Sequence, residues 1–290
     1  MTGLIGKGRS AIDIITDAGS FIENLAGDIS GYRNIGPGAV VGTGSINGKP
    51  ATILSIDAMV MNKRFPTIYA GIIGLEEAYK MAMAVYNTIY ADAQKKKEDK
   101  RPIVLIVDTP GNGPGKTEEI FGMNKSTGAY QLALAEARQY GHPVLAIVIG
   151  RAISGAFLCH GLQADHIIAL SKDFGTVIHV MPLSSIARIT KMDIETLEDL
   201  SKSNPVFASG ADFFCKLGGI EEIIGSISDI KPTVIRHIDE IYALRAENTL
   251  ENTGPWSRGE LGAKRGGRIV RSQVILKMKT EFDFVSEKYI

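Results

Sequence analysis

Glycines gather in one short stretch that follows a run of apolar residues, IVLIVDTPGNGPGKT (103–117). Two nucleotide-binding patterns overlap in it, a DxxG that ends at Gly111 and a Gly-Lys-Thr that ends at Thr117. A phosphate loop needs a glycine, four residues and then Gly-Lys-Ser/Thr. Pro110 stands where that first glycine is required, and proline has no N–H group to donate. The spacing therefore argues against nucleotide binding and favours a tight turn between a strand and a helix.

A second turn of the same form lies in IGRAISGAFLCHGLQADHIIAL (149–170). An apolar run leads to Gly150, four residues follow, and Gly155-Ala156 then opens a short helix. Ser154 is a candidate N-cap of that helix. The amides of Gly155 and Ala156 are expected to point out of its first turn without partners inside the helix. This turn is therefore a place where a negative oxygen can approach the backbone.

Two such turns on adjacent strands would face one crevice at the carboxyl edge of the sheet. The backbone amides of Gly111 and Gly113 would then lie opposite those of the second turn. Two N–H donors aimed at one carbonyl oxygen stabilise an oxyanion or an enolate, and each donor is worth roughly 3–4 kcal/mol in the transition state. The alternative is that the glycines serve only backbone freedom in tight turns.

No set of side chains competes with the amides as catalytic groups. The five histidines form no HxH or HExxH pattern, and Ser154 has no histidine at a triad-like spacing. His142 and His166 stand at strand starts, where structural roles are expected. His179 follows a glycine-containing loop and is the one histidine that is a candidate to line the crevice. The sequence therefore predicts no metal site and a chemistry performed by backbone amides.

The elements that must position these turns alternate between strands and helices, which predicts crossover units in an α/β architecture. Asn47-Gly48 between two β-rich runs predicts a hairpin. With neither a low-complexity linker nor an internal repeat, a single domain is expected. The predicted elements are a helix over 9–25 broken near Gly19, hairpin strands 39–46 and 50–57, helices 75–93, 127–140, 155–161, 184–202, 209–217 and 229–249, strands 103–107, 144–149 and 166–170, and a Gly- and Arg-rich loop (252–268) before a terminal helix.

The overall composition gives no reason to expect nucleic acid or a membrane as partner. The 290 residues carry 32 basic and 32 acidic side chains, and 44% are hydrophobic. No stretch approaches the roughly 18 apolar residues of a membrane span, and the N-terminus lacks the features of a secretory signal. Two cysteines without metal-like spacing favour a reducing compartment. A cytoplasmic location is expected.

Several motifs together resemble the carboxyltransferase branch of the crotonase superfamily. Asp17-Ala-Gly-Ser-Phe-Ile-Glu23 is similar to its D-x-G-S-F-x-E, and GPGAVVGTGSING (36–48) to its glycine-rich hairpin. IVLIVDTPGNGPG (103–115) is similar to its L-V-D-T-P-G-x-x-x-G turn, and Gly150–Asp165 to its second glycine turn. The resemblance implies a crotonase-like (ClpP/crotonase) fold of stacked ββα units with flanking helices. It implies a single domain over 1–290, with a helical N-terminal arm (about 1–30) and a C-terminal helical extension (about 229–290).

Within this branch the sequence most resembles the gamma subunit of biotin-independent malonate decarboxylase. The stretches that carry this resemblance are Gly141-His-Pro143, Ser154-Gly-Ala-Phe157, His160-Gly-Leu-Gln-Ala-Asp165, Ile178-His-Val-Met181 and Ala187-Arg-Ile-Thr190. The resemblance implies a homologous beta subunit as partner in a heterodimer. Together the two would convert a malonyl thioester on an acyl carrier protein into an acetyl thioester and CO2. It also implies a carrier arm of phosphoribosyl-dephospho-coenzyme A, an acyl-carrier-protein transferase subunit, and no biotin.

Two departures from the wider branch bear on the chemistry. Biotin-dependent relatives usually carry Gly-Gly-Ala at the second turn, where this chain has Ser154-Gly155-Ala156. Residues 61–77 stand where relatives often have a Gly-Gly-Ser loop that helps to bind the acyl group. The thioester oxygen is therefore expected to be held by the beta subunit, with the amides here acting on the departing carboxylate or completing the cavity.

Two alternatives to a decarboxylase subunit stay open. One is the carboxyltransferase subunit of a biotin-dependent acyl-CoA carboxylase, and the other is a non-catalytic partner of an active beta subunit. The basic residues of 252–268 are candidate contacts for the carrier protein or a phosphate of its arm, although a solvated loop is the simpler interpretation. These residues are Arg258, Lys264, Arg265 and Arg268.

Overall fold

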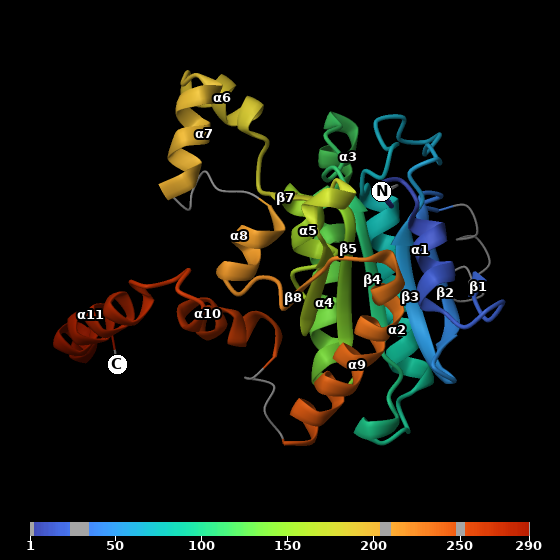
Figure 1. Ribbon diagram of the computed structural model, residues 1–290. Coiled ribbons are helices and arrows are strands. Elements are labelled where there is room, and N and C mark those ends of the chain that lie inside the picture. The colour runs from blue at the N-terminus through green and yellow to red at the C-terminus, as the bar shows by residue number, and fades with distance from the viewer. Residues whose placement is uncertain (1–2, 24–34, 204–209, 248–252, 290) are drawn as a thin grey trace.

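A twisted β-sheet forms the centre of the molecule, with helices on both faces (Figure 1). The computed structural model describes residues 3–23, 35–203, 210–247 and 253–289. The strands follow the order β1-β2-β3-β4-β5-β6-β8, and β7 pairs with β5 off this path. Their bounds are β1 Ile22–Glu23, β2 Ala39–Ile46, β3 Lys49–Ile56, β4 Ile103–Thr109, β5 Val144–Ile153, β6 His166–Leu170, β7 Val177–His179 and β8 Glu222–Ile224.

The predicted hairpin is present, and it forms the antiparallel side of the sheet. β2 and β3 pair in register from Ala39↔Ile56 to Ile46↔Lys49, around a turn in which Asn47 and Gly48 both have positive φ. Such a turn matches the natural twist of the two strands. From β3 onward the strands of the main path run parallel. The central strands β4, β5 and β6 are almost entirely buried and rich in β-branched residues, as expected for strands covered on both faces.

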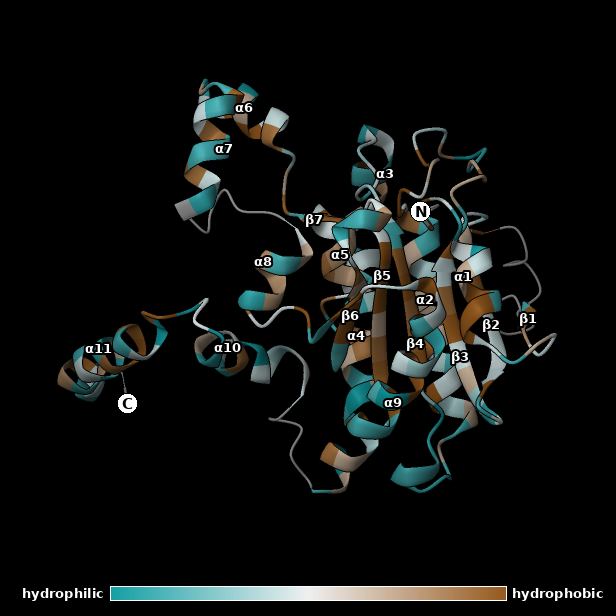
Figure 2. Ribbon diagram, in the orientation of Figure 1, coloured by the Kyte–Doolittle hydropathy of each residue, from teal (hydrophilic) through white to brown (hydrophobic). Residues whose placement is uncertain are grey.

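Helices divide the core into two layers. One layer packs α2, α4 and α5 against the sheet, and the other packs α1 and α9 against its opposite face. Figure 2 shows the apolar strands enclosed between helices whose outer surfaces are more hydrophilic. The helix bounds are α1 Gly8–Ile15, α2 Leu75–Ala91, α3 Lys116–Phe121, α4 Met123–Gln139, α5 Ser154–Cys159, α6 Leu183–Thr190, α7 Ile194–Ser203, α8 Ala211–Lys216, α9 Ile230–Ala246, α10 Gly254–Lys264 and α11 Arg271–Val285.

Three sequence predictions are wrong in this part of the molecule. The first helix ends at Ile15, and residues 22–23 pair with β2 as the short strand β1. The helix expected over 184–202 is two helices, α6 and α7, because the chain turns at Lys191, whose φ is +62°. The loop expected over 252–268 contains α10, which opens with Gly254-Pro255. Proline at the first turn of a helix gives up an N–H group that would have no partner there.

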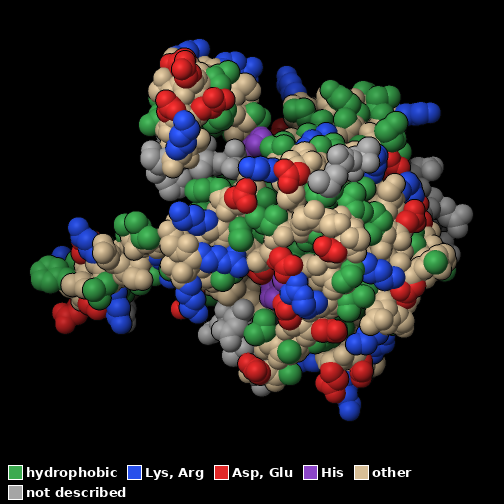
Figure 3. All heavy atoms as spheres, viewed as in Figure 1, with side chains coloured by type: hydrophobic (Ala, Val, Ile, Leu, Met, Phe, Trp, Pro, Cys, Tyr) green, Lys and Arg blue, Asp and Glu red, His purple; other side chains and the backbone are tan. Residues whose placement is uncertain are grey.

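The C-terminal helix α11 extends away from the sheet and buries none of its side chains (Figure 1). The surface in Figure 3 mixes acidic and basic side chains without a large patch of one sign. No helix among the described residues is both long and apolar enough to span a lipid bilayer.

Candidate functional site

The two glycine turns lie side by side at the carboxyl edge of the sheet. β4 and β5 are parallel neighbours, and their pairing reaches Thr109↔Ala152, directly before the turns. Gly155 faces the side chain of Asn112, since a Cβ built at Gly155 would lie 2.8 Å from Oδ1 of Asn112. The juxtaposition expected from the two apolar runs is therefore present, and Asn112 is the contact between the turns that the sequence patterns did not indicate.

The second turn is held in an unusual backbone conformation. Ser154 has a φ of +56°, in the left-handed region that favours glycine, and it opens α5 without a side-chain cap. The prediction of Ser154 as N-cap is therefore wrong. A non-glycine residue in this region is strained, and such strain persists where the surrounding structure imposes it, often at functional sites. The first N–H groups of a helix have no acceptor inside it, so Gly155 and Ala156 provide the donors of this turn.

The first turn does not offer the donors that the sequence suggested. The N–H of Gly113 donates to the carbonyl oxygen of Ile73 at 2.9 Å, and the N–H of Gly111 donates to Oγ1 of Thr109 at 3.3 Å. Both amides are thus used within the fold. The prediction that they form part of an oxyanion hole is wrong for this conformation, because a donor bonded to a protein acceptor is not free for substrate.

The segment before α2 explains why these amides are occupied. Ile73 pairs with Asn112 as an isolated parallel bridge and also donates its own N–H to the carbonyl of Gly111. The fully buried carboxylate of Glu118 then ties the turn to the same segment, accepting bonds from Oγ1 of Thr67 and from the N–H of Leu75. The segment before α2 thus closes over the first turn.

His179 lies next to the second turn, because the last residues of β5 pair with β7. The register places Ile153 opposite His179, one residue before Ser154. Nδ1 of His179 is buried and has no hydrogen-bond partner among the described residues. Burial lowers the pKa of His179, so the ring is neutral near pH 7. An unpartnered ring nitrogen on the strand that pairs with the residues before the second turn makes His179 a candidate for proton transfer or for binding a substrate oxygen.

The acidic residue of the DxxG pattern has a structural role. Asp108 accepts hydrogen bonds from the N–H of Gly6 at 2.6 Å and of Arg151 at 2.8 Å, and it forms an ion pair with the Arg151 guanidinium. Lys116 and Thr117 are exposed on α3. The carboxylate thus joins the N-terminal segment to β5, which agrees with the prediction that this loop is not a nucleotide site.

Two of the four basic candidates are used inside the protein. Arg258 is buried and donates to the carbonyl oxygens of Leu162 and Ala164. Arg265 donates to carbonyl groups that include those of Cys215 and Ile220. The prediction that these two contact a carrier protein is wrong, because their guanidinium groups hold α10 to the main body.

The other two basic candidates are more accessible. Lys264 is exposed, and Arg268 is exposed while its Nε donates to the carbonyl of Leu217 at 2.8 Å. They remain available for a partner.

The A-D pair before β6 anchors several elements at once. The carboxylate of Asp165 is fully buried and accepts bonds from Arg138 at 2.7 Å, Arg245 at 2.6 Å and the N–H of Val144 at 2.8 Å. These charged and amide donors outweigh the effect of burial and lower the pKa of Asp165. This part of the motif therefore supports the scaffold rather than the chemistry.

The second turn offers a pair of backbone donors, at Gly155 and Ala156, and His179 lies on the strand that pairs with the residues before it. The donor pair can bind a single negative oxygen, and none of the site residues suggests a nucleophile. A reaction of a bound anion fits this donor set better than a covalent intermediate.

Comparisons with known proteins identify relatives of this chain. Residues 69–281 match the family model of the malonate decarboxylase gamma subunit. A protein of Malonomonas rubra described as malonyl-S-ACP:biotin-protein carboxyltransferase MADD is 60% identical over 286 residues, which is 98% of either chain.

Two solved structures of Pseudomonas malonate decarboxylase are similar in fold. A chain of the hetero-tetramer in complex with coenzyme A has a TM-score of 0.75 and 26% identity, over 94% of this chain and 99% of that chain. A chain of the MdcD-MdcE hetero-dimer has a TM-score of 0.65 and 28% identity, over 87% and 96%. These likenesses confirm the fold class that the sequence motifs implied.

Proposed function

Because this chain belongs to the malonate decarboxylase gamma-subunit family, we propose that it removes the carboxyl group of a malonyl thioester carried on an acyl carrier protein. A homologous beta subunit would complete the site, as in the MdcD-MdcE hetero-dimer of Pseudomonas. The observation that carries the proposal is the strained turn at Ser154, which presents the amides of Gly155 and Ala156 next to the first glycine turn.

The chemical step suits backbone donors. The bond between the carboxyl carbon and the α-carbon of the malonyl group breaks, and its electron pair forms an enolate with the negative charge on the thioester oxygen. A proton added at the α-carbon then gives the acetyl thioester. Amide donors at the thioester oxygen stabilise the charge that develops there, and donors at the carboxylate orient it for cleavage, so no covalent intermediate is needed.

We assign the amides of Gly155 and Ala156 to one oxygen of the departing carboxylate, which they would hold and orient for cleavage. The thioester oxygen, where negative charge develops, is assigned to the beta subunit. The support is that the amides of Gly111 and Gly113 already have acceptors within the fold. One donor pair in this chain serves one oxygen, so the thioester oxygen that receives the charge must be met by the partner subunit.

The fate of the carboxyl group separates two candidate functions. Release as CO2 without biotin would make the complex a carboxy-lyase, as in the biotin-independent enzymes that the sequence resembles. Transfer to a biotin carrier protein is favoured by the 60% identical relative, whose description names a biotin protein as acceptor. In that case the second-turn amides would hold an oxygen of the biotin ring, with Ser154 in place of the usual glycine.

A labelling experiment distinguishes these fates. The complex with its beta subunit receives malonyl carrier protein labelled in the free carboxyl group, with and without a biotin carrier protein and avidin. Transfer is supported if the label appears on the biotin protein and avidin prevents this. Release is supported if the label becomes volatile CO2 and avidin has no effect. If the label stays on the malonyl group in both cases, the proposed carbon–carbon cleavage is refuted.

The remaining partners follow from the same family. The carrier protein would present a phosphoribosyl-dephospho-coenzyme A arm, and a transferase subunit would load it, so that this chain binds no cofactor directly. Lys264 and Arg268 remain candidate contacts for the carrier. A beta subunit that is fully active alone would instead support a purely structural role for this chain. We further propose a cytoplasmic location.

A further inference from the structure

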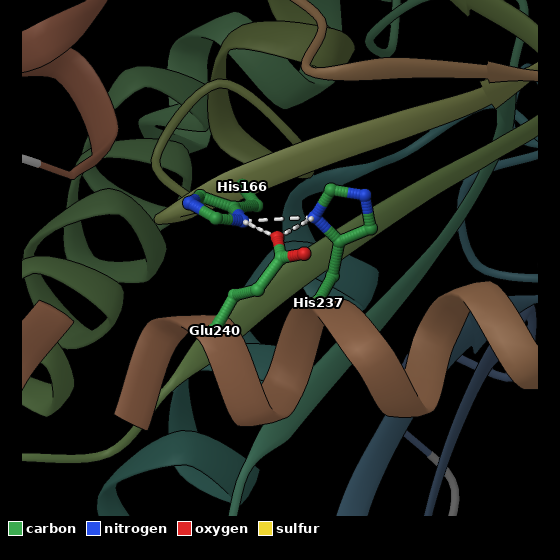
Figure 4. Close-up of side chains that lie close together, drawn as sticks. All are labelled: His166, His237 and Glu240. Atoms are coloured by element: carbon green, nitrogen blue, oxygen red, sulfur yellow. Dashed lines mark hydrogen bonds and ion pairs between the residues drawn. The ribbon is translucent and has the colours of Figure 1, made fainter. Parts of the chain in front are cut away.

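Two histidines and a glutamate converge between α9 and the start of β6, away from the glycine turns. His166 is the first residue of β6, while His237 and Glu240 lie one turn apart on α9 (Figure 4). The two histidines are buried and Glu240 is 42% exposed in its side chain. Figure 4 shows the three side chains pointing toward one another from these two elements.

The separations of the three side-chain atoms suit a common metal ion. Nδ1 of His166 and Nδ1 of His237 are 2.9 Å apart, and Oε2 of Glu240 lies 3.9 Å from the first and 3.3 Å from the second. A tetrahedral ion with bonds of about 2.0–2.2 Å holds its ligand atoms about 3.3–3.5 Å apart. The observed values bracket this distance, so small side-chain movements would form the site.

Counting protons favours a cation over hydrogen bonds alone. Nε2 of His237 lies 3.3 Å from a carboxylate oxygen of Glu222, and a neutral ring that donates its Nε2 proton to that oxygen keeps a lone pair on Nδ1. That lone pair and Oε2 of Glu240 are both acceptors and face each other at 3.3 Å. His166 has one Nδ1 proton at most and can satisfy only one of them. A metal ion would satisfy all three.

The surroundings resemble the outer shell of a histidine metal site. A ligating histidine usually donates its other ring N–H to a carboxylate, which fixes the ring orientation. Glu222 on β8 occupies that position beside His237. Arg236 brings the nearest positive charge, but it pairs with Glu222 and with Oε1 of Glu240, leaving Oε2 to face the histidines.

We propose that His166, His237 and Glu240 bind one divalent transition-metal ion of the zinc class, with a fourth position open to water on the exposed side of Glu240. Imidazole and carboxylate ligands suit this class. The ion would fasten α9 to β6 and β8, three elements that are distant in sequence. Its role would be structural, because these ligands stand at the start of β6, whereas the glycine turns follow the carboxyl ends of β4 and β5.

The test uses the full chain without a purification tag, stripped of metal by a chelator and titrated with Co²⁺ and then Zn²⁺. We expect one ion per chain, visible absorption typical of four-coordinate cobalt that Zn²⁺ abolishes, and a higher melting temperature with Zn²⁺. Glu240→Gln should remove the cobalt absorption. Glu222→Gln, which affects only the outer shell, should weaken binding roughly 10–100-fold.

Asp239→Asn is the matched control, since it removes an exposed carboxylate from the same helix next to the site. It should bind as the unaltered chain does. The proposal is overturned if the stripped chain binds neither ion, or if Glu240→Gln binds both ions as tightly as Asp239→Asn does. A proton shared between the two histidines would then explain their short separation. Neither readout depends on enzymatic activity.

Discussion

Replacing Gly155 by valine tests the second-turn amides directly. The new Cβ would lie 2.8 Å from Oδ1 of Asn112, which is the end of a flexible side chain that can rotate away. The fold should therefore tolerate the change, while the two methyl groups block the approach of an oxygen to the amides. If these amides orient the carboxylate, a misplacement of about 1 Å costs about 100-fold in turnover. Because Gly111 and Gly113 use their amides within the fold, they cannot take over this role.

The assay is release of the carboxyl label from malonyl carrier protein by the complex with the beta subunit, after gel filtration shows that the complex is intact. Gly225→Val is the control, because a Cβ at Gly225 meets nothing within 4 Å. We expect the control to retain full turnover and Gly155→Val to lose about 100-fold. An intact Gly155→Val complex with unchanged turnover would refute the role of these amides.

Three further predictions concern single residues. Ser154→Gly should retain turnover and change the free energy of unfolding by less than about 1 kcal/mol, because relief of the left-handed φ is offset by added chain entropy. Asp165→Asn should lower the free energy of unfolding by about 3–5 kcal/mol in urea, since Arg138 and Arg245 lose their buried partner. Burial lowers the pKa of His160 to about 4, below that of an unfolded histidine. Neutral His160 therefore contributes up to about 3 kcal/mol to the free energy of unfolding above about pH 6.5, and this contribution is lost as the pH falls toward 4. Urea unfolding of His160→Gln should lack that part of the pH dependence.

Each of these has an outcome that contradicts it. A large loss of turnover in Ser154→Gly would show that the hydroxyl takes part in the reaction. Unaltered stability of Asp165→Asn would mean that the two arginines find other acceptors. An equal acid sensitivity in His160→Gln and the unaltered chain would assign the effect to other groups, such as His142, whose pKa burial also lowers.

Local patterns predicted much of the fold because their physical causes are local. Continuous apolar runs gave β4 and β6, and Asn47-Gly48 placed the hairpin turn correctly. The wrong predictions concern segments whose secondary structure depends on tertiary contacts. Residues 252–268 look like a loop by their glycines, yet Arg258 and Arg265 reach distant carbonyl groups and stabilise α10.

The site was predictable only in part for the same reason. The spacing of the turns indicated that Gly155 lies near the first turn, since adjacent parallel strands end at one edge. The hydrogen bond that occupies the Gly113 amide could not be predicted, because its acceptor Ile73 lies forty residues earlier in the chain and belongs to no recognisable motif. The histidine cluster also escaped notice, because His166 and His237 meet only through the packing of α9.

β5 continues beyond the end of its pairing with β6, and its last three residues are joined by β7 on one side while Ala152 still pairs with β4 on the other. Strand pairing on both sides of β5 therefore fixes the backbone at Ser154 in the absence of substrate. The carboxyl group of a free malonyl thioester rotates in water, whereas one bound to dipoles fixed in this way would already be oriented for cleavage. The contribution that we propose for this chain would then be present in the folded sheet before substrate binds, without any closing motion at this turn.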